Sequence, residues 1–529
     1  MGLEVARTEK RRIALQTEFD GQRSQAQRNR LGQFATPADL ALEIADFVKS
    51  LLEDDQAIHF CDPAVGTGAF YSALRTVFAD NSIASAVGVE IDPSLARIAR
   101  ELWGRFGLRV VEGDFTRFAT SAGQARRPNV ILTNPPYVRH HHMEREYKAA
   151  IQRLSQKSVG LRISGLTGLY VHFVLLATEW MSDGGIGAWL IPSEFMDVNY
   201  GEALRRYLSE RVTLIRIHRF DPQNVQFDDA LVSSAVVVFR KTVPSDSTEV
   251  RFTLGGSLEE PAVLQDVPLS RLCPNEKWTL YPPDPKDESR TCNGKSRLKF
   301  SDLFEVRRGI ATGSDKTFIL PRDEALRLGL PEKWLKPILP SPRHLKRTIL
   351  EADTAGYPKI ETPLAVIDCA LPEAVVREDY PTLWAYFCEA EKTGVTNRYL
   401  LRRRTPWYKL EQRKVAPFLC TYMGRGAKEK RPFRFIWNRT AATATNLYLL
   451  VYPRDHLARV LRSRSERAAE VFEFLCGISG VDLRNAGRVY GGGLHKMEPK
   501  ELGAISVDAL VRMIPELESA ISRSTLFDV

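Results

Sequence analysis

The sequence predicts an α/β protein, in which a parallel-rich sheet with helices on both faces is followed by a second domain of mixed α+β structure. Between residues 31 and 242, short apolar runs alternate with amphipathic helical stretches, which is the pattern of repeated strand–helix–strand units. After residue 300 this periodicity weakens and prolines recur. A chain of 529 residues is long enough for several domains, each with its own core.

Each expected strand is a short apolar run, and each expected helix carries apolar residues at helical spacing. The expected strands are 58–61, 86–90, 108–112, 129–133, 186–192, 213–220 and 234–240. The expected helices are 37–52, 69–78, 93–106, 168–181 and 201–210. We therefore predict four parts: a basic N-terminal arm or exposed helix at 1–30, the sheet domain at 31–242, a connecting segment rich in Pro, Ser and Asp at 243–300, and the second domain at 301–529.

The composition is that of an ordinary globular protein, which argues against a disordered chain or a disulfide scaffold. No apolar run approaches the length of a membrane span, and the N-terminus lacks the apolar core of a secretory signal. The seven cysteines are scattered without metal-ligand spacing, as is typical of reduced cytosolic thiols. We therefore expect a cytoplasmic protein without a membrane contact. The adjacent His140, His141 and His142 have no ligand partner at suitable spacing, so we predict no metal site.

Positive charge is concentrated in one stretch of the chain. Residues 402–439 contain twelve Lys or Arg and two Glu, a net charge of +10, whereas the whole chain carries +9. Aromatic residues are interleaved with these charges. Basic side chains neutralise phosphates, while the aromatics either stack on bases or pack into a core beneath a solvated face. The concentration of charge favours a polyanionic partner.

A glycine turn follows the first expected strand, in the stretch HFCDPAVGTGAF that ends at Phe70. Gly66 and Gly68 permit a sharp strand-to-helix turn and a close approach of a ligand to the backbone. Glu90 ends the second strand, where a carboxylate can accept hydrogen bonds from ribose hydroxyls. Asp114 and Phe115 follow the third strand, where the carboxylate can accept from an adenine amino group and the ring can lie against the base. These features, in this order, predict a site for a nucleoside cofactor.

The spacing of the glycines narrows the choice of cofactor. The turn lacks the GxGxxG spacing of dinucleotide sites, and the chain contains no GKS or GKT of a P-loop. Both absences from the sequence favour S-adenosylmethionine over NAD or ATP.

The tetrapeptide Asn134-Pro135-Pro136-Tyr137 follows the fourth strand. The prolines remove two backbone donors and leave the Pro135 carbonyl free to accept. The Asn134 amide oxygen and this carbonyl are two acceptors that can hold one NH2 group, and Tyr137 offers a flat face to an aromatic ring. A Pro-Pro loop with a buried Asn is the alternative. The position directly after the fourth strand, behind a nucleotide site, favours an amine substrate.

The motifs DPAVGTGAF, GVEIDP, EGDF and NPPY, in this order, resemble the amino-methyltransferases that modify adenine in DNA. The stretch 31–48, LGQFATPADLALEIADFV, resembles the helix-opening motif of that family. Its position ahead of the glycine turn, with a long region after the sheet, matches the gamma-class arrangement of restriction-modification systems. Pieces of the second domain resemble the target-recognition region of such enzymes, namely 309–320, 404–413, 446–450 and 487–502.

This resemblance implies a Rossmann-like, S-adenosylmethionine-dependent methyltransferase sheet at 31–242 and a DNA target-recognition domain at 301–529. It further implies methylation of the N6 amine of an adenine flipped out of double-stranded DNA. The implied state is a monomer or weak dimer, and the implied partner is a restriction endonuclease that acts on the same site.

The motif positions and the resemblance together assign the site residues. The cofactor-binding set is Thr36, Asp62, Ala64, Gly66, Gly68, Glu90, Asp114, Phe115 and Asn134. The catalytic set is Asn134, Pro135, Pro136 and Tyr137, and Tyr137 and Phe227 are expected to stack on the flipped base. The residues expected to contact DNA are Arg307, Arg308, Lys316, Arg402, Arg403, Arg404, Arg413, Lys414, Arg425, Lys428 and Lys496.

Other functions share parts of this pattern. The N4 amine of cytosine is chemically close, but that class more often carries Ser-Pro-Pro-Tyr, so Asn134 favours adenine. RNA and protein amines are further alternatives, and both predict a smaller or differently placed accessory domain. A non-catalytic DNA-binding protein on the same scaffold is disfavoured by the intact Glu90, Asp114 and Asn134.

Overall fold

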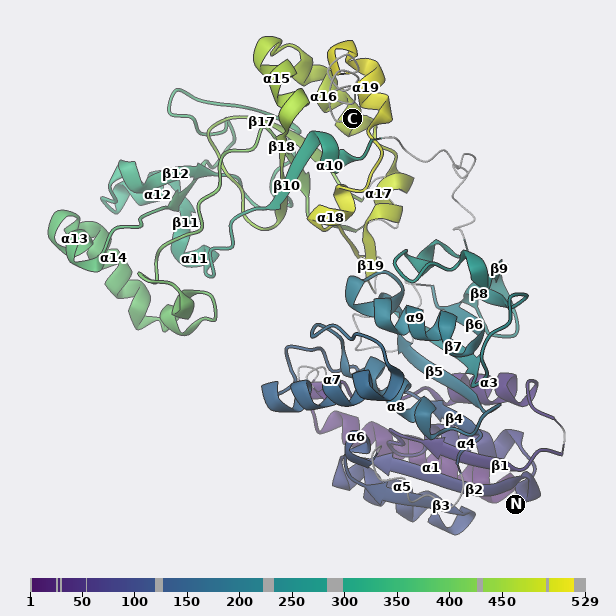
Figure 1. The fold of residues 1–529 in the computed structure, drawn as a ribbon. Coiled ribbons are helices and arrows are strands. Elements are labelled where there is room, and N and C mark those ends of the chain that lie inside the picture. Colours follow the sequence, from purple (N-terminus) through teal and green to yellow (C-terminus); the bar gives the residue numbers. More distant parts are fainter. Residues whose placement is uncertain are drawn as a thin grey trace. The chain divides into compact units, whose positions relative to one another are not determined.

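The computed structural model describes residues 2–24, 27–28, 31–53, 55–118, 127–221, 233–282, 298–425, 432–490 and 494–517. The chain divides into two compact units (Figure 1). The first, here the sheet unit, contains Met1–Asp287 and Tyr490–Gly492. The second, here the C-terminal unit, contains Glu288–Val489 and Gly493–Val529.

The sheet unit is built on a nine-stranded sheet with the order β3-β2-β1-β4-β5-β7-β6-β8-β9. Its strands are β1 (Ile58–Asp62), β2 (Ile83–Glu90), β3 (Leu108–Glu112), β4 (Val130–Thr133), β5 (Ile186–Pro192), β6 (Thr213–Arg219), β7 (Ser234–Arg240), β8 (Glu249–Gly256) and β9 (Pro261–Pro268). The first five strands in this order, β3, β2, β1, β4 and β5, are parallel to one another. Strand β7 lies between β5 and β6 and runs antiparallel to both. The strand order reverses between β1 and β4, and ligands of such sheets bind outside the carboxyl ends of the strands at this point.

Helices cover both faces of this sheet, as predicted (Figure 1). They are α1 (Gly2–Gly21), α3 (Ala38–Lys49), α4 (Ala69–Val77), α5 (Pro93–Trp103), α6 (Phe115–Phe118), α7 (Arg145–Val159), α8 (Leu169–Trp180) and α9 (Glu202–Glu210). Neighbouring residues of β5 point to opposite faces because side chains alternate along a strand. Trp189 joins a core cluster with α8 and α9, whereas Leu190 joins one with α3 and α4.

The seven predicted strands correspond to β1–β7, and the five predicted helices to α3, α4, α5, α8 and α9, with ends that agree within three residues. The predicted connecting segment 243–300 contains β8 and β9, which extend the sheet through parallel pairing of β8 with β6. Helix α7 was not predicted. The predicted exposed arm contains α1, which lies against α4 and buries Val5, Thr8 and Arg12.

The C-terminal unit is of mixed α+β structure, as predicted. Its strands form a five-stranded sheet in the order β10-β18-β15-β17-β13 and two three-stranded sheets, β11-β14-β12 and β16-β20-β19. The strands are β10 (Phe304–Arg308), β11 (Ile319–Pro321), β12 (Leu335–Ile338), β13 (Ile349–Glu351), β14 (Leu364–Ile367), β15 (Phe418–Thr421), β16 (Met423–Arg425), β17 (Phe435–Arg439), β18 (Tyr448–Pro453), β19 (Arg488–Tyr490) and β20 (Leu494–Lys496).

The helices of this unit pack in two groups. They are α10 (Phe300–Leu303), α11 (Asp315–Phe318), α12 (Arg322–Arg327), α13 (Glu373–Asp379), α14 (Pro381–Lys392), α15 (Asp455–Ser463), α16 (Arg467–Gly477), α17 (Gly480–Ala486), α18 (Pro499–Leu502) and α19 (Asp508–Met513). Helices α15–α19 share a core with the five-stranded sheet, whereas α13 and α14 share one with β11, β12 and β14. Among the helices that the structure describes in either unit, none combines the length and apolar character that a membrane span requires.

Candidate active site and nucleic-acid interface

The glycine turn lies at the carboxyl end of β1. Gly66 and Gly68 have φ angles of +54° and +93°, in the left-handed region that favours glycine. A Cβ atom on Gly68 would lie 2.5 Å from the Trp103 ring, so this glycine is required for packing. At Gly66 no described atom lies within 4 Å of a Cβ position, so its backbone faces open space. The turn therefore leaves room for a ligand in front of Gly66.

Glu90 at the end of β2 is tied to the glycine turn. One carboxylate oxygen accepts from the backbone N–H of Gly66 at 2.9 Å and the other from that of Asp92 at 2.9 Å. The side chain is buried, and burial raises the pKa of its carboxyl group. Ile91, which follows it, is 65% exposed and offers an apolar surface beside the carboxylate. Sequence reasoning missed Ile91, although its place directly after an acidic strand end is a usable signal.

Asp62 at the end of β1 is 1% exposed. Its Oδ1 accepts from the Ala64 N–H at 3.0 Å and from the Thr133 hydroxyl at 2.7 Å. Its Oδ2 is buried and finds no hydrogen-bond partner among the residues that the structure describes. Burial raises the pKa of this carboxyl group to about 7. A buried acceptor without a donor is costly, so Oδ2 is suited to an amine or hydroxyl donor of a ligand.

Asn134 directly follows β4, and within the described residues only the nitrogen of its amide group forms hydrogen bonds. The amide nitrogen donates to the Phe34 carbonyl at 3.0 Å and to the Thr36 hydroxyl at 3.2 Å. The amide oxygen is buried and has no partner within the described part of the chain. Among the described residues, no group donates a hydrogen bond to the Pro135 carbonyl. The loop thus presents the two acceptors that the sequence predicts for an NH2 group.

Tyr137 is anchored by both its backbone and its side chain. Its N–H donates to the Gly32 carbonyl at 3.0 Å, and its hydroxyl donates to the Leu190 carbonyl at 3.1 Å. Burial raises the pKa of this hydroxyl, and the ring packs beside Phe34 with centroids 5.4 Å apart. Phe227, the second predicted stacking residue, lies outside the described residues.

Asp114 and Phe115 are neighbours in the sequence, but their side chains lie in different surroundings. The Asp114 carboxylate accepts from the backbone N–H and the hydroxyl of Thr116, at 2.9 Å and 2.7 Å, at the start of α6. The Phe115 ring is buried in the core, with centroids 5.2 Å from Phe173 and 4.7 Å from Trp180. This differs from the expectation that the ring faces an adenine, because burial between two aromatic side chains stabilises an inward orientation.

Helix α1 contributes contacts that sequence reasoning missed. The Arg12 guanidinium donates to the Thr67 hydroxyl at 3.2 Å, and this hydroxyl donates to Gln16 at 2.8 Å. Thr67 stands between the two glycines of the turn. Beyond α1, Arg23 forms an ion pair with Asp92 at 2.6 Å. No local signal could have identified these pairs, because each joins residues that are far apart in the sequence.

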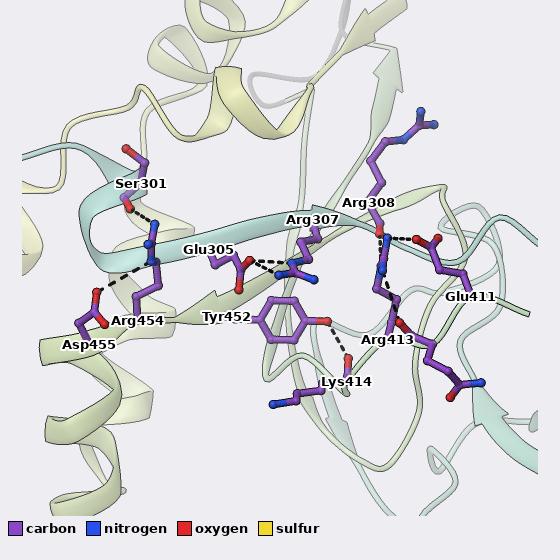
Figure 2. A network of polar contacts seen from close by, with 11 residues as sticks. Ser301, Glu305, Arg307, Arg308, Glu411, Arg413, Lys414, Tyr452, Arg454 and Asp455 are labelled. Carbon is purple, nitrogen blue, oxygen red and sulfur yellow. Dashed lines mark hydrogen bonds and ion pairs between the residues drawn. The ribbon is translucent and has the colours of Figure 1, made fainter.

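The predicted DNA-binding residues belong to the C-terminal unit, and three of them gather around Tyr452 near the edge strand β10 (Figure 2). Arg307 is paired with Glu305 at 2.7 Å, and Arg413 is paired with Glu411. Lys414 is exposed, and its carbonyl accepts from the Tyr452 hydroxyl at 2.7 Å.

The other predicted DNA contacts are Arg308, which lies on the same strand β10 and whose carbonyl accepts from Arg413 at 3.4 Å (Figure 2), and residues elsewhere in this unit. The guanidinium of Arg308 lies 4.3 Å from the Tyr422 ring centroid, and the Lys496 ammonium lies 5.2 Å from the same ring. Lys316, Arg402 and Arg403 are exposed. The side chain of Arg425 and the whole of Lys428 lie outside the described residues.

Arg404 is placed differently from its basic neighbours. Its guanidinium donates to the carbonyls of Ala311 and Thr312, at 2.6 Å and 2.8 Å. These two hydrogen bonds stabilise the loop that contains Ala311 and Thr312. The aromatics of 402–439 mostly support the core alternative, since six of them are buried: Trp407, Tyr408, Phe418, Tyr422, Phe433 and Phe435. Sequence reasoning missed an exposed basic loop that contains Arg343, His344, Lys346 and Arg347, although its basic density was visible.

Comparisons with known proteins find matches in both units of the chain. A family model described as the Eco57I restriction-modification methylase matches residues 108–226, and one described as the C-terminal domain of the type II methyltransferase M.Eco57I matches residues 275–525. The type II methyltransferase M.XamI of Xanthomonas campestris pv. amaranthicola is 27% identical over 493 residues, covering 91% of this chain and 86% of that protein. The type II methyltransferase M.AccI of Acinetobacter calcoaceticus is 24% identical, covering 92% of this chain and 87% of that protein.

Similarity over most of the chain extends to solved structures. The type IIL restriction-modification enzyme MmeI, determined in complex with DNA, aligns with a TM-score of 0.53 at 14% identity, a likeness of fold. The alignment covers 87% of this chain and 63% of that one. One family model falls within the sheet unit and the other covers most of the C-terminal unit, and the two relatives match along more than nine-tenths of the sequence. Over most of its length the chain is thus similar to restriction-modification methyltransferases of the Eco57I type, and it is a DNA methyltransferase.

Proposed function

We propose that this protein transfers a methyl group from S-adenosylmethionine to the N6 amine of an adenine that is flipped out of double-stranded DNA. The observation that carries this proposal is a pair of acceptors, the buried Asn134 amide oxygen and the adjacent Pro135 carbonyl, neither of which has a partner among the described residues. Two acceptors suit the two hydrogens of one exocyclic amine. The proposed biological role is protection of DNA from a restriction endonuclease that acts on the same site.

The residues at the carboxyl edge of the sheet fit S-adenosylmethionine. Within the described ranges the buried Oδ2 of Asp62 lacks a donor, and the space in front of Gly66 is open. Glu90 is proposed to bind the ribose, and Asp114 the adenine amino group. The further contacts proposed are Thr36, Ala64 and Gly68. When bound, the cofactor supplies an electrophilic methyl group carried on a sulfonium sulfur.

The chain's own task is to bind and orient the amine. Asn134 and the Pro135 carbonyl accept its two hydrogens, which leaves the nitrogen lone pair as the nucleophile. Fixed acceptors also stabilise the positive charge that develops on the nitrogen as the new bond forms. The proton that the nitrogen then loses passes to water. A covalent adduct with a cysteine is not required for transfer to an amine.

An adenine inside a duplex cannot reach this crevice, so the base must leave the stack. Tyr137, whose ring is fixed by Leu190 and Phe34, and Phe227 are the proposed stacking residues. The exposed basic residues of the C-terminal unit are proposed to bind the phosphate backbone.

The test is transfer of tritiated methyl groups to duplex DNA, RNA and protein, with mass spectrometry of the modified nucleoside. We expect label in duplex DNA as N6-methyladenine. We expect Asn134→Ala to abolish transfer while S-adenosylmethionine affinity changes less than about threefold, since the amide acts on the acceptor base. If the product contains N4-methylcytosine instead, the target base is cytosine and not adenine. Full activity of Asn134→Ala would refute the role of the amide.

A further inference from the structure

The segment 32–36 lies along the loop that carries Asn134. The Gly32 carbonyl accepts from the Tyr137 N–H at 3.0 Å, and the Phe34 carbonyl and the Thr36 hydroxyl accept from the Asn134 amide nitrogen at 3.0 Å and 3.2 Å. Gly32 has a φ of +66°, and a Cβ there would lie 2.5 Å from the Tyr137 nitrogen. The segment and the loop are therefore closely fitted.

The Phe34 carbonyl determines which way the Asn134 amide faces, and the Thr36 hydroxyl adds a second hydrogen bond in that orientation. A backbone carbonyl only accepts hydrogen bonds, so the amide nitrogen must face Phe34. The reverse orientation would place the amide oxygen against the Phe34 carbonyl oxygen, and two acceptors repel each other. The amide oxygen therefore lies on the far side of the group, where it is buried and has no partner in the described ranges.

Thr36 is well suited to hold this orientation. Pro37 follows it and restricts its backbone to extended conformations, and its β-branched side chain has few rotamers. The hydroxyl accepts from Asn134, and its own hydrogen meets no acceptor among the described residues. The same hydroxyl can thus accept from the amide and donate to a bound ligand at once.

We propose that Thr36 is a positioning residue: its hydroxyl, together with the Phe34 carbonyl, fixes the Asn134 amide so that the amide oxygen meets the target amine. This inference rests on the proposed function and deepens it, because it gives Thr36 a part in transfer besides the expected contact with the cofactor.

The test compares Thr36→Val, which keeps the branched shape but removes the hydroxyl, with Thr36→Ser, which keeps the hydroxyl. We expect kcat and kcat/KM for duplex DNA to fall together by about five- to tenfold in Thr36→Val, the effect of one lost neutral hydrogen bond. Because the hydroxyl is also a proposed cofactor contact, S-adenosylmethionine affinity, measured by calorimetry, is expected to fall as well, so kcat is measured at saturating cofactor. Thr36→Ser should restore both the rate and the affinity. Thr213→Val, which removes a hydroxyl at the opposite end of the sheet, is the matched control.

A second readout does not depend on activity. In protein labelled with 15N-asparagine, the side-chain NH2 signal of Asn134 is identified by its loss in Asn134→Asp. Its hydrogens should exchange slowly with solvent in the wild type and faster in Thr36→Val. Unchanged kcat or unchanged exchange in Thr36→Val would overturn the proposal, as would a loss confined to cofactor affinity. If the wild type does not methylate adenine, the proposed function fails, and the exchange experiment still decides whether Thr36 orients the amide.

Discussion

The carboxyl group of Asp62 couples the stability of the sheet unit to pH. Burial raises its pKa to about 7, although hydrogen bonds from Thr133 and Ala64 act in the opposite direction. Because the pKa in the folded state lies above the unfolded value of about 4, the folded protein favours the protonated form. The associated stability is therefore fully present below about pH 4 and is lost as the pH rises through about 7.

Asp62→Asn removes this ionisation and keeps an oxygen that can accept from Ala64 and Thr133. We expect the free energy of unfolding of the wild type to decrease between pH 5 and pH 8, and that of the variant to decrease less. A tenfold change in an acid dissociation constant between the unfolded and folded states corresponds to roughly 1.4 kcal/mol. Urea unfolding followed by circular dichroism at both pH values measures the difference. Asp183→Asn, at an exposed side chain, is the control, and equal pH slopes for wild type and Asp62→Asn would contradict the prediction.

At the scale of elements, helix α1 supports the glycine turn from outside the predicted sheet domain. Arg12 is 2% exposed and donates to the Thr67 hydroxyl, which in turn donates to Gln16. Arg12→Met keeps most of the side-chain volume and removes the donor. We expect it to weaken S-adenosylmethionine binding about three- to tenfold, as one lost hydrogen bond between the helix and the turn would. Arg11→Met, on the exposed face of the same helix, should leave calorimetric affinity unchanged. Equal affinities for the two variants would show that α1 does not act on the turn.

The elements that sequence reasoning identified share a strong local signal. Strands β4 and β5 are buried along their whole length and appear as continuous apolar runs. The residues at their carboxyl ends could then be placed together, because the carboxyl ends of parallel strands meet at one edge of a sheet. Helix α7 carried little signal, since its only buried residues are Ile151, Ser155 and Val159 along one narrow stripe. Edge strand β9 is mostly exposed or half-buried. The inward turn of Phe115 depends on tertiary packing, which local patterns do not reveal.

At the scale of the whole molecule, the positive charge and the cofactor site fall in different units. The stretch 402–439, with its net charge of +10, belongs to the C-terminal unit, whereas Asp62, Glu90 and Asn134 belong to the sheet unit. If the exposed arginines of the C-terminal unit bind phosphates, their removal must change DNA affinity without changing cofactor affinity. The ion pairs of Arg307 with Glu305 and of Arg413 with Glu411 are exposed or half-buried, so they contribute little to stability.

The double variant Arg307→Gln/Arg413→Gln tests this separation. Each phosphate contact that is lost should lower the slope of log affinity against log salt concentration by about 0.9, so we expect a decrease of up to about 2 for duplex DNA. Fluorescence anisotropy over a series of salt concentrations measures the slope, and calorimetry should show unchanged S-adenosylmethionine affinity. Arg251→Gln, at an exposed arginine that is paired with Asp266 in the sheet unit, is the matched control. Arg404→Met should instead lower the urea midpoint, because it removes two bonds to backbone carbonyls. An unchanged salt slope in the double variant would place the DNA-binding surface elsewhere, and the exposed basic loop with Arg343 and Arg347 would be the next to test.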